Sequence, residues 1–231
     1  MLNRASADQS LPDVSSRTLF VWTKMQAEGG QSLASILEIK EAERQAGDGV
    51  FWWGVGNSLG SAVRKAATDS GGTLPVLFSQ MRSPPKKADT HPSGVCIWNT
   101  WKGPDGKEHE IPNHVLEWSR GTLDKKSHYA LVCHSDQPLR LDHHAFEPSL
   151  CRTHLGNPLG GSQVTALLEG DLDADHAPGS YHFGFRATLV APWMVMLVKP
   201  RLLSDDERAT HSIWRKDGDW RHFINRFRGY G

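Results

Sequence analysis

A run of aromatic and small residues, Trp52-Trp53-Gly54-Val55-Gly56-Asn57, carries the strongest chemical signal in the chain. Neighbouring side chains on a strand point to opposite faces, so if Trp52 packs into the core, Trp53 faces a groove or solvent. A nucleobase stacks on an indole, and the amide of Asn57 can donate and accept hydrogen bonds beside it. The tract therefore predicts a site for one nucleobase. The alternative is that both indoles belong to the core and that Asn57 caps the next helix.

The overall charge offers no general attraction to nucleic acid. The 26 Lys and Arg residues balance the 26 Asp and Glu residues, so any binding of phosphates depends on local patches. Basic residues gather between Trp52 and Ala88 and again between Arg208 and Arg228. These groups predict phosphate contacts, and the alternative is an ordinary solvated surface.

The cysteines and the hydropathy pattern indicate the compartment. Cys96, Cys133 and Cys151 are an odd number without a paired framework, which favours reduced thiols and a cytoplasmic protein. No run of about 18 apolar residues is present, so no membrane span is expected. The polar start of the chain lacks the apolar core of a signal peptide, which supports the same expectation.

Hydrophobic periodicity and turn residues predict a mixed α/β (α+β) fold with two early helices and about seven short strands. These strands favour a small mixed β-barrel flanked by short helices. We expect a flexible arm over residues 1–16, a domain over 17–203 with a loop-rich insertion at about 136–178, and an aromatic, basic helical tail over 204–231. The expected helices cover 32–44, with Ser32 as a possible cap, and a short segment ending at Ala67. The expected strands cover 18–22, 50–53, 74–79, 94–99, 129–133, 181–190 and 193–198, the last two paired across Ala191-Pro192.

This order of elements resembles the PUA-like superfamily, and within it the EVE domains, which are similar to the YTH and ASCH domains. The resemblance covers about residues 18 to 200. It depends on Trp22-Thr23-Lys24, on the Trp52–Asn57 tract and on Leu77-Phe78-Ser79 before Pro84-Pro85. The chain departs from the EVE pattern at Gly56, where Arg is usual, at Lys86, where Gly is usual, and in the long insertion.

The resemblance implies a cleft that accepts one modified base flipped out of DNA or RNA. Trp53 would then be a wall of the cleft, Asn57 would read a base edge, and Ser79 would donate or accept a hydrogen bond. The candidate base-binding residues are Trp53, Asn57, Trp22, Ser79, Trp98, Trp52 and Val55, and the candidate phosphate-binding residues are Lys24, Arg64, Lys65 and Arg82. The alternative for each aromatic residue is a place in the core, and for each cation an ordinary surface position.

Rival functions depend on other residues. Asp142-His143-His144, Cys151 and His154 have the ligand types of zinc but match no familiar zinc spacing, so neither a metal nor a cofactor is predicted. Asp171, Asp173 and Asp175 could serve a metal-dependent nuclease. The tail aromatics could dock a protein partner. We expect a non-catalytic reader, with a nuclease or helicase as a candidate partner protein; the sequence does not choose between DNA and RNA.

Overall fold

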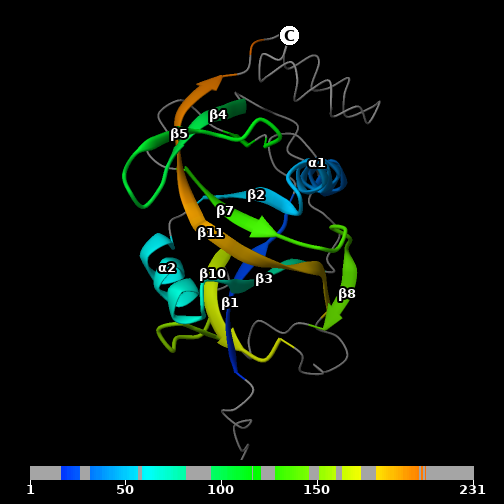
Figure 1. Cartoon of the computed structure of the whole chain (residues 1–231). Helices are drawn as coiled ribbons and strands as arrows, with labels where there is room; N and C mark the ends of the chain where they lie inside the picture. Colours follow the sequence, from blue (N-terminus) through cyan, green and yellow to red (C-terminus); the bar gives the residue numbers. More distant parts are fainter. Residues whose placement is uncertain are drawn as a thin grey trace, which may run out of the picture.

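The computed structural model of the protein describes residues 17–26, 32–56, 59–81, 95–115, 117–120, 128–145, 151–159, 163–172, 181–202, 204 and 206. Within these residues the fold is mixed α+β, with two helices and a sheet of eleven strands, which confirms the predicted class (Figure 1). The arm predicted for residues 1–16 and nearly all of the predicted tail lie outside the described residues. No helix in the described part is long and apolar enough to cross a membrane.

The first half of the chain contains both helices. Its elements are β1 (Thr18–Lys24), α1 (Leu33–Ala46), β2 (Val50–Val55), α2 (Gly60–Asp69), β3 (Leu74–Met81) and β4 (Val95–Lys102). Strands dominate the remainder: β5 (Glu108–Glu110), β6 (Trp118–Arg120), β7 (His128–His134), β8 (Asp142–Ala145), β9 (Arg152–Thr153), β10 (Thr165–Gly170) and β11 (Tyr181–Leu202).

The main path of the sheet runs in the order β2-β7-β11-β3-β1-β10-β9. β1 and β3 are parallel, and the other neighbouring pairs on this path are antiparallel. β2 and β9 stand at the two ends of the order, and no ladder between described residues joins them. The hydrogen-bonded sheet is therefore open along this path.

One long strand, β11, joins the two halves of the sheet. Along one edge it pairs first with β8 and then with β7, and along the other edge it pairs first with β3, up to Leu189, and then with β4, from Met196. Its ladder with β7 shifts register between Leu189 and Met194. The prediction of two strands paired with each other across Ala191-Pro192 was wrong, because both segments belong to one continuous strand (Figure 1). β7 pairs with this strand on both sides of Ala191-Pro192.

The sheet also contains residues that we predicted to lie in a loop-rich insertion. Thr165–Gly170 forms β10, which pairs antiparallel with β1 from Thr18↔Gly170 to Thr23↔Thr165. Most of β10 is buried, because Ala166, Leu167 and Leu168 pack against other strands. The range 136–178 thus supplies a direct neighbour of β1.

Both predicted helices are present, but the cap was predicted correctly only for α1. α2 begins after Leu59 without a side-chain cap, so Asn57 is not its N-cap. The Ser32 hydroxyl accepts a hydrogen bond from the Ser35 N–H at 3.2 Å, which caps α1. Leu33, Ile36 and Leu37 recur at helical spacing and are buried. Gly47 follows the last turn, and its N–H donates to the Glu43 carbonyl at 2.8 Å.

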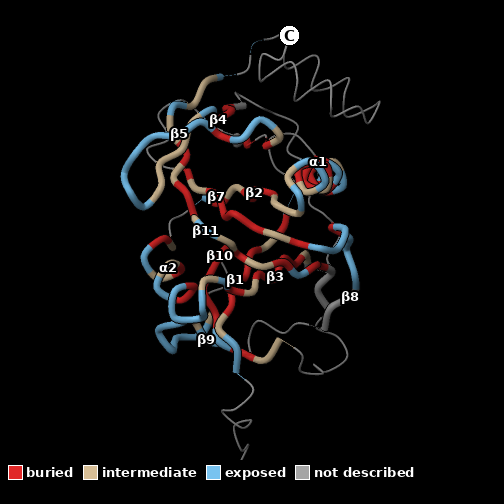
Figure 2. Tube along the Cα trace, in the orientation of Figure 1, coloured by how far each residue is buried: buried red, intermediate tan, exposed pale blue. Residues whose placement is uncertain are grey.

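Buried apolar residues form three clusters, which we name after a tryptophan in each; Figure 2 shows buried segments of several strands meeting in the middle of the molecule. The Trp53 cluster is the largest and receives both helices; it includes Val21, Met25, Leu33, Ile36, Phe51, Trp53, Val55, Val63, Phe78, Leu131, Phe185 and Met194. The Trp52 cluster contains Trp52, Trp98, Ile111, Val115, Ala130, Val132, Val195 and Leu197. The Trp22 cluster contains Phe20, Trp22, Leu77, Cys151, Ala166 and Leu168.

Candidate functional site

β2 sends its two adjacent indoles to opposite faces, as strand alternation predicts. Trp53 is 7% exposed and belongs to the Trp53 cluster, whereas Trp52 is 4% exposed and belongs to the Trp52 cluster. Both faces of β2 are therefore covered by apolar side chains, so the expectation that Trp53 faces a groove or solvent when Trp52 is in the core was wrong. Trp53 lies three residues before Gly56 and two residues before Val55, where β2 ends.

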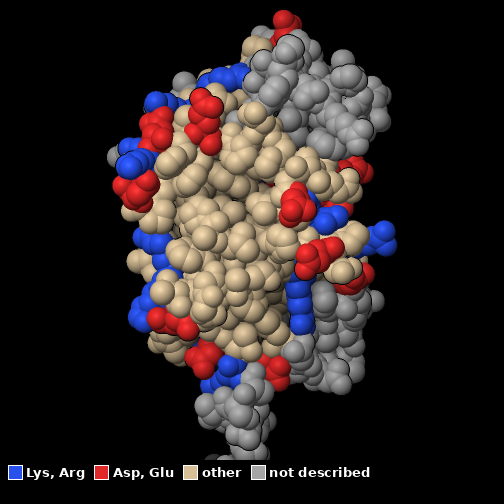
Figure 3. Space-filling view, in the orientation of Figure 1, with Lys and Arg blue, Asp and Glu red and all other residues tan. Residues whose placement is uncertain are grey.

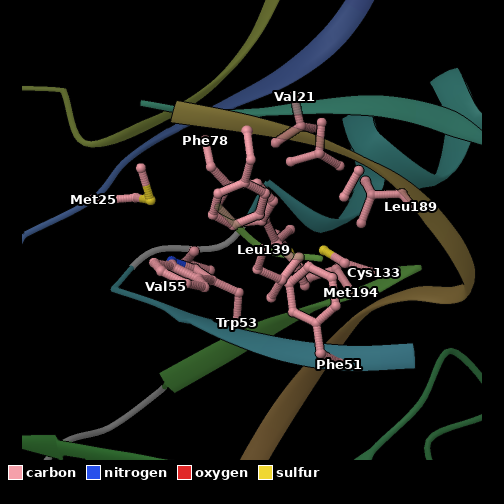
Figure 4. Close-up of a cluster of buried hydrophobic side chains, with 14 of the residues drawn as sticks. Val21, Met25, Phe51, Trp53, Val55, Phe78, Cys133, Leu139, Leu189 and Met194 are labelled. Atoms are coloured by element: carbon pink, nitrogen blue, oxygen red, sulfur yellow. The ribbon is translucent and has the colours of Figure 1, made fainter. Parts of the chain in front are cut away.

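Trp53 packs among aromatic rings from two neighbouring strands. Its ring centroid lies 4.8 Å from that of Phe78 on β3, with an interplanar angle of 65°, and 6.4 Å from that of Phe185 on β11. Phe78 and Phe185 stack on each other at 4.5 Å and 14°. Figure 4 shows Trp53 and Val55 together on one side of this cluster, with Met25 beside them. These edge-on contacts pack the indole against β3 and β11 on one face of β2.

Trp22 and Ser79 lie together on the other face of β1 and β3. The Trp22 Nε1–H donates to the Ser79 hydroxyl oxygen at 2.7 Å, and Ser79 is fully buried. The Ser79 carbonyl accepts a hydrogen bond from the Met25 N–H at 2.8 Å, which ties the end of β1 to β3. The indole of Trp22 thus holds the hydroxyl of Ser79 in a fixed place, as an acceptor.

Trp52 and Trp98 both belong to the Trp52 cluster, and each contacts a further aromatic ring. Trp52 makes an edge contact with Trp101, with centroids 5.8 Å apart at 80°, and Trp98 stacks on His128 at 5.3 Å and 2°. Trp98 is 1% exposed, and its Nε1–H has no hydrogen-bond partner within the part of the chain that the structure describes. Trp101 extends the aromatic series toward the surface, where it stacks on His109.

The structure therefore brings the predicted base-binding residues together in pairs rather than in one group. Trp53 lies with Val55, Trp52 with Trp98, and Trp22 with Ser79, and each pair belongs to a different face or cluster. Asn57 lies outside the described residues. The pair of Trp53 and Val55 lies in the last half of β2, and β2 leads into the predicted Gly56–Asn57 turn.

The predicted phosphate-binding cations lie on separate elements. Lys24 ends β1 and Arg64 lies on α2, and both are half-buried. Lys65, also on α2, is exposed and forms an ion pair with Asp69 at 2.5 Å. Arg82 lies outside the described residues. On the face shown in Figure 3, blue and red groups alternate along the sides, and the middle is uncharged.

Sequence reasoning missed a buried ionic network beside β2. Lys40 and Glu43 on α1 pair at 2.9 Å, and the Lys40 ammonium also contacts the Glu117 carboxylate. The side chains of Lys40, Glu43 and Glu117 are 5%, 0% and 3% exposed. The spacing of Lys40 and Glu43, three residues apart on a predicted helix, was a detectable signal for that pair. Glu117 carried no comparable signal, because a tertiary contact 77 residues away brings it to Lys40.

The network keeps its cation charged. Burial lowers the pKa of Lys40, but the attraction of Glu117 and Glu43 exceeds this effect and holds the pKa above its ordinary value of 10.5. The Cys133 thiol lies near the same charges. Its pKa is raised, mainly because burial disfavours the thiolate, so Cys133 is a neutral thiol in the core.

The rival constellations do not assemble within the described residues. Cys151 is buried beside Gly170, whereas His154 is exposed, and no group of three or more His, Cys, Asp or Glu side chains there could hold a metal ion. The side chains of His143 and His144, and the residues Asp173 and Asp175, lie outside the described part.

Comparison with known proteins adds no relative: no family model, no curated protein and no solved structure matches the chain.

Proposed function

We propose that the protein is a nucleic-acid-binding reader domain that accepts a single modified base, for example a methylated one, at the end of β2. One observation supports this site above the others. The Trp53 indole lies in the last half of β2, is packed edge-on against Phe78, and comes three residues before the Gly56–Asn57 pair that the sequence marks as a turn. A rigid ring beside a turn residue with an amide has the chemistry for stacking one base and reading its edge.

The resemblance to the PUA-like superfamily supplies the ligand class of this proposal, together with a small barrel as the finer fold. The order β1, α1, β2, α2, β3 is the one on which the resemblance depends. β1 and β3 are parallel neighbours, and β2 lies across β7 and β11 from β3. A long β11 that changes partners midway is the kind of strand that lets an open sheet curve toward closure.

The energy balance of the proposed site is reasonable. Flipping a base costs a few kcal/mol, and stacking contributes about 1–3 kcal/mol per base. One indole wall with one or two hydrogen bonds therefore offsets the cost. Lys24, Arg64, Lys65 and Arg82 would hold phosphates, which position the strand without identifying the base. Lys65 would exchange its exposed pairing with Asp69 for a phosphate at little cost.

Competition binding tests this function. Labelled DNA and RNA oligonucleotides with one methylated base, and unmodified oligonucleotides of the same sequence, are titrated with the purified chain at fixed salt. We expect tighter binding of a modified oligonucleotide, recovered intact. Equal binding of all pairs would contradict the reader, and cleavage in the presence of divalent metal would favour the nuclease. An absence of any binding would favour the protein-interaction module.

A further inference from the structure

Among the described residues, the outer edge of β2 is held by α1 and by no second strand. β2 pairs with β7 along one edge. On its other edge the Trp52 N–H donates to the Glu43 carboxylate at 3.2 Å, and the Val50 N–H donates to the Gly47 carbonyl at 3.0 Å. A side-chain carboxylate thus occupies the place that a neighbouring strand would take. The position of β2 therefore depends on where α1 holds Glu43.

The Glu43 carboxylate is itself fixed by the buried network. Lys40 Nζ donates to both Glu43 carboxylate oxygens, at 2.9 and 3.2 Å, and also contacts Glu117. Ion pairs buried to this extent keep their geometry, because a displaced charge would lose its partner without gaining water. The network therefore joins α1 to the segment before β6 as one rigid polar unit beside β2.

Glu117 reaches the same strand at a second point, Gly54. A Cβ added to Gly54 would lie 2.7 Å from Glu117 Oε2, so that the carboxylate would have to shift, and 3.1 Å from His128 Nε2, a tight contact. This explains why a glycine follows the two tryptophans. The next glycine, Gly56, has open space around it, because an added Cβ would meet nothing within 4 Å.

Trp53 lies between these two points of contact. Glu43 holds the backbone of Trp52, and Glu117 packs against Gly54. We propose that Lys40, Glu43 and Glu117 are positioning residues that set the angle of the Trp53 indole from the far side of β2. The effect of this positioning on base discrimination rests on the proposed function. The positioning of Trp53 itself can be measured without any ligand.

The two glycines offer a matched test. The indole N–H signals are recorded by ¹⁵N NMR, and the Trp53 signal is assigned by its loss in Trp53→Phe. We expect Gly54→Ala to move the Trp53 signal and Gly56→Ala to leave it in place. In the binding assay, Gly54→Ala should reduce the preference for the modified base about tenfold, which corresponds to about 1.4 kcal/mol of lost stacking.

A second pair of variants tests the network; both remove the charge of Glu43, so they match each other in charge. Glu43→Gln and Glu43→Leu both leave Lys40 paired with Glu117, but only Gln retains a side-chain oxygen for the Trp52 N–H. We expect the Trp53 signal and the preference for the modified base to survive in Glu43→Gln and to change in Glu43→Leu.

Two results would overturn the positioning role: equal effects of Gly54→Ala and Gly56→Ala, or an unmoved Trp53 signal in Glu43→Leu. If Gly54→Ala does not fold, the Glu43 pair decides alone. If the wild-type chain discriminates no oligonucleotide, the proposed function fails, and the NMR signals still decide whether the network positions Trp53.

Discussion

At the scale of single residues, Trp53 contributes both to the core and to the proposed site, and these two roles must be separated. Its ring contacts Phe78 and Phe185, and only 7% of its surface is exposed. An alanine at this position would leave a cavity as well as remove a stacking surface. Loss of binding in such a variant would therefore not identify a wall of the site.

We expect Trp53→Ala to lower the free energy of unfolding by about 3–5 kcal/mol, because a large buried ring is removed. Trp53→Phe should retain most of the stability and reduce the preference for a modified base, since the stacking surface is smaller. Urea unfolding and the competition assay together measure both effects. A Trp53→Phe variant with an unchanged preference for the modified base would show that the indole is not a wall.

Strand alternation predicted which way each indole of β2 points, because side-chain direction is a local property of the backbone. Alternation did not predict that both faces are covered. The partners of Trp53 on β3 and β11 come from distant parts of the chain, and sequence spacing does not show them. The same limit hid Glu117 and His128, which reach Gly54 only through the fold.

At the scale of elements, α1 is bound to the sheet by charges as well as by apolar packing. We expect Lys40→Met to destabilise the protein by about 3–5 kcal/mol, because Glu43 and Glu117 would remain as buried carboxylates without their cation. Lys65→Met is the control, since its ion pair with Asp69 is exposed and contributes less than about 1 kcal/mol. Thermal or urea unfolding of the two variants makes the comparison. Equal losses would show that the network does not stabilise the fold.

The lowered pKa of Glu41 predicts that the protein loses stability in acid. Hydrogen bonds from Arg44 lower its pKa to about 2 from an ordinary 4.5; burial opposes this shift, and the Leu139 N–H at 2.8 Å and Gln45 support it. Because the folded pKa is depressed, the contribution is present above pH 4.5 and is lost as the pH falls toward 2. Glu41→Gln should therefore be less stable than wild type at pH 6, and the difference should shrink by pH 2. A difference that does not change with pH would contradict this role.

Helices and most strands were predictable because their signals are local. Ser32 caps α1, and the apolar run at 74–79 forms β3. β10 was missed because four consecutive buried residues do not distinguish a strand from a buried turn of helix. β11 was divided at Ala191-Pro192 because proline usually interrupts a strand. In the structure Ala191-Pro192 lies at the register shift of the β11–β7 ladder, between the end of the β3 ladder and the start of the β4 ladder. Such a position is a property of the whole sheet.

At the scale of the whole molecule, the balanced charge limits how nucleic acid can be held. The chain has no net charge, and Lys24 and Arg64 stand on different elements, so phosphate contacts would be few. A small number of contacts gives a shallow dependence of affinity on salt, with a loss of about one unit of slope for each cation removed. Discrimination between bases would then depend on stacking rather than on charge.

The affinity ratio for matched modified and unmodified oligonucleotides, measured at two salt concentrations, tests the central claim most directly. The proposed reader predicts a ratio well above one that stays constant as salt weakens both affinities, because stacking identifies the base and phosphates do not. A ratio of one at both salt concentrations, across the methylated DNA and RNA bases tested, would contradict it.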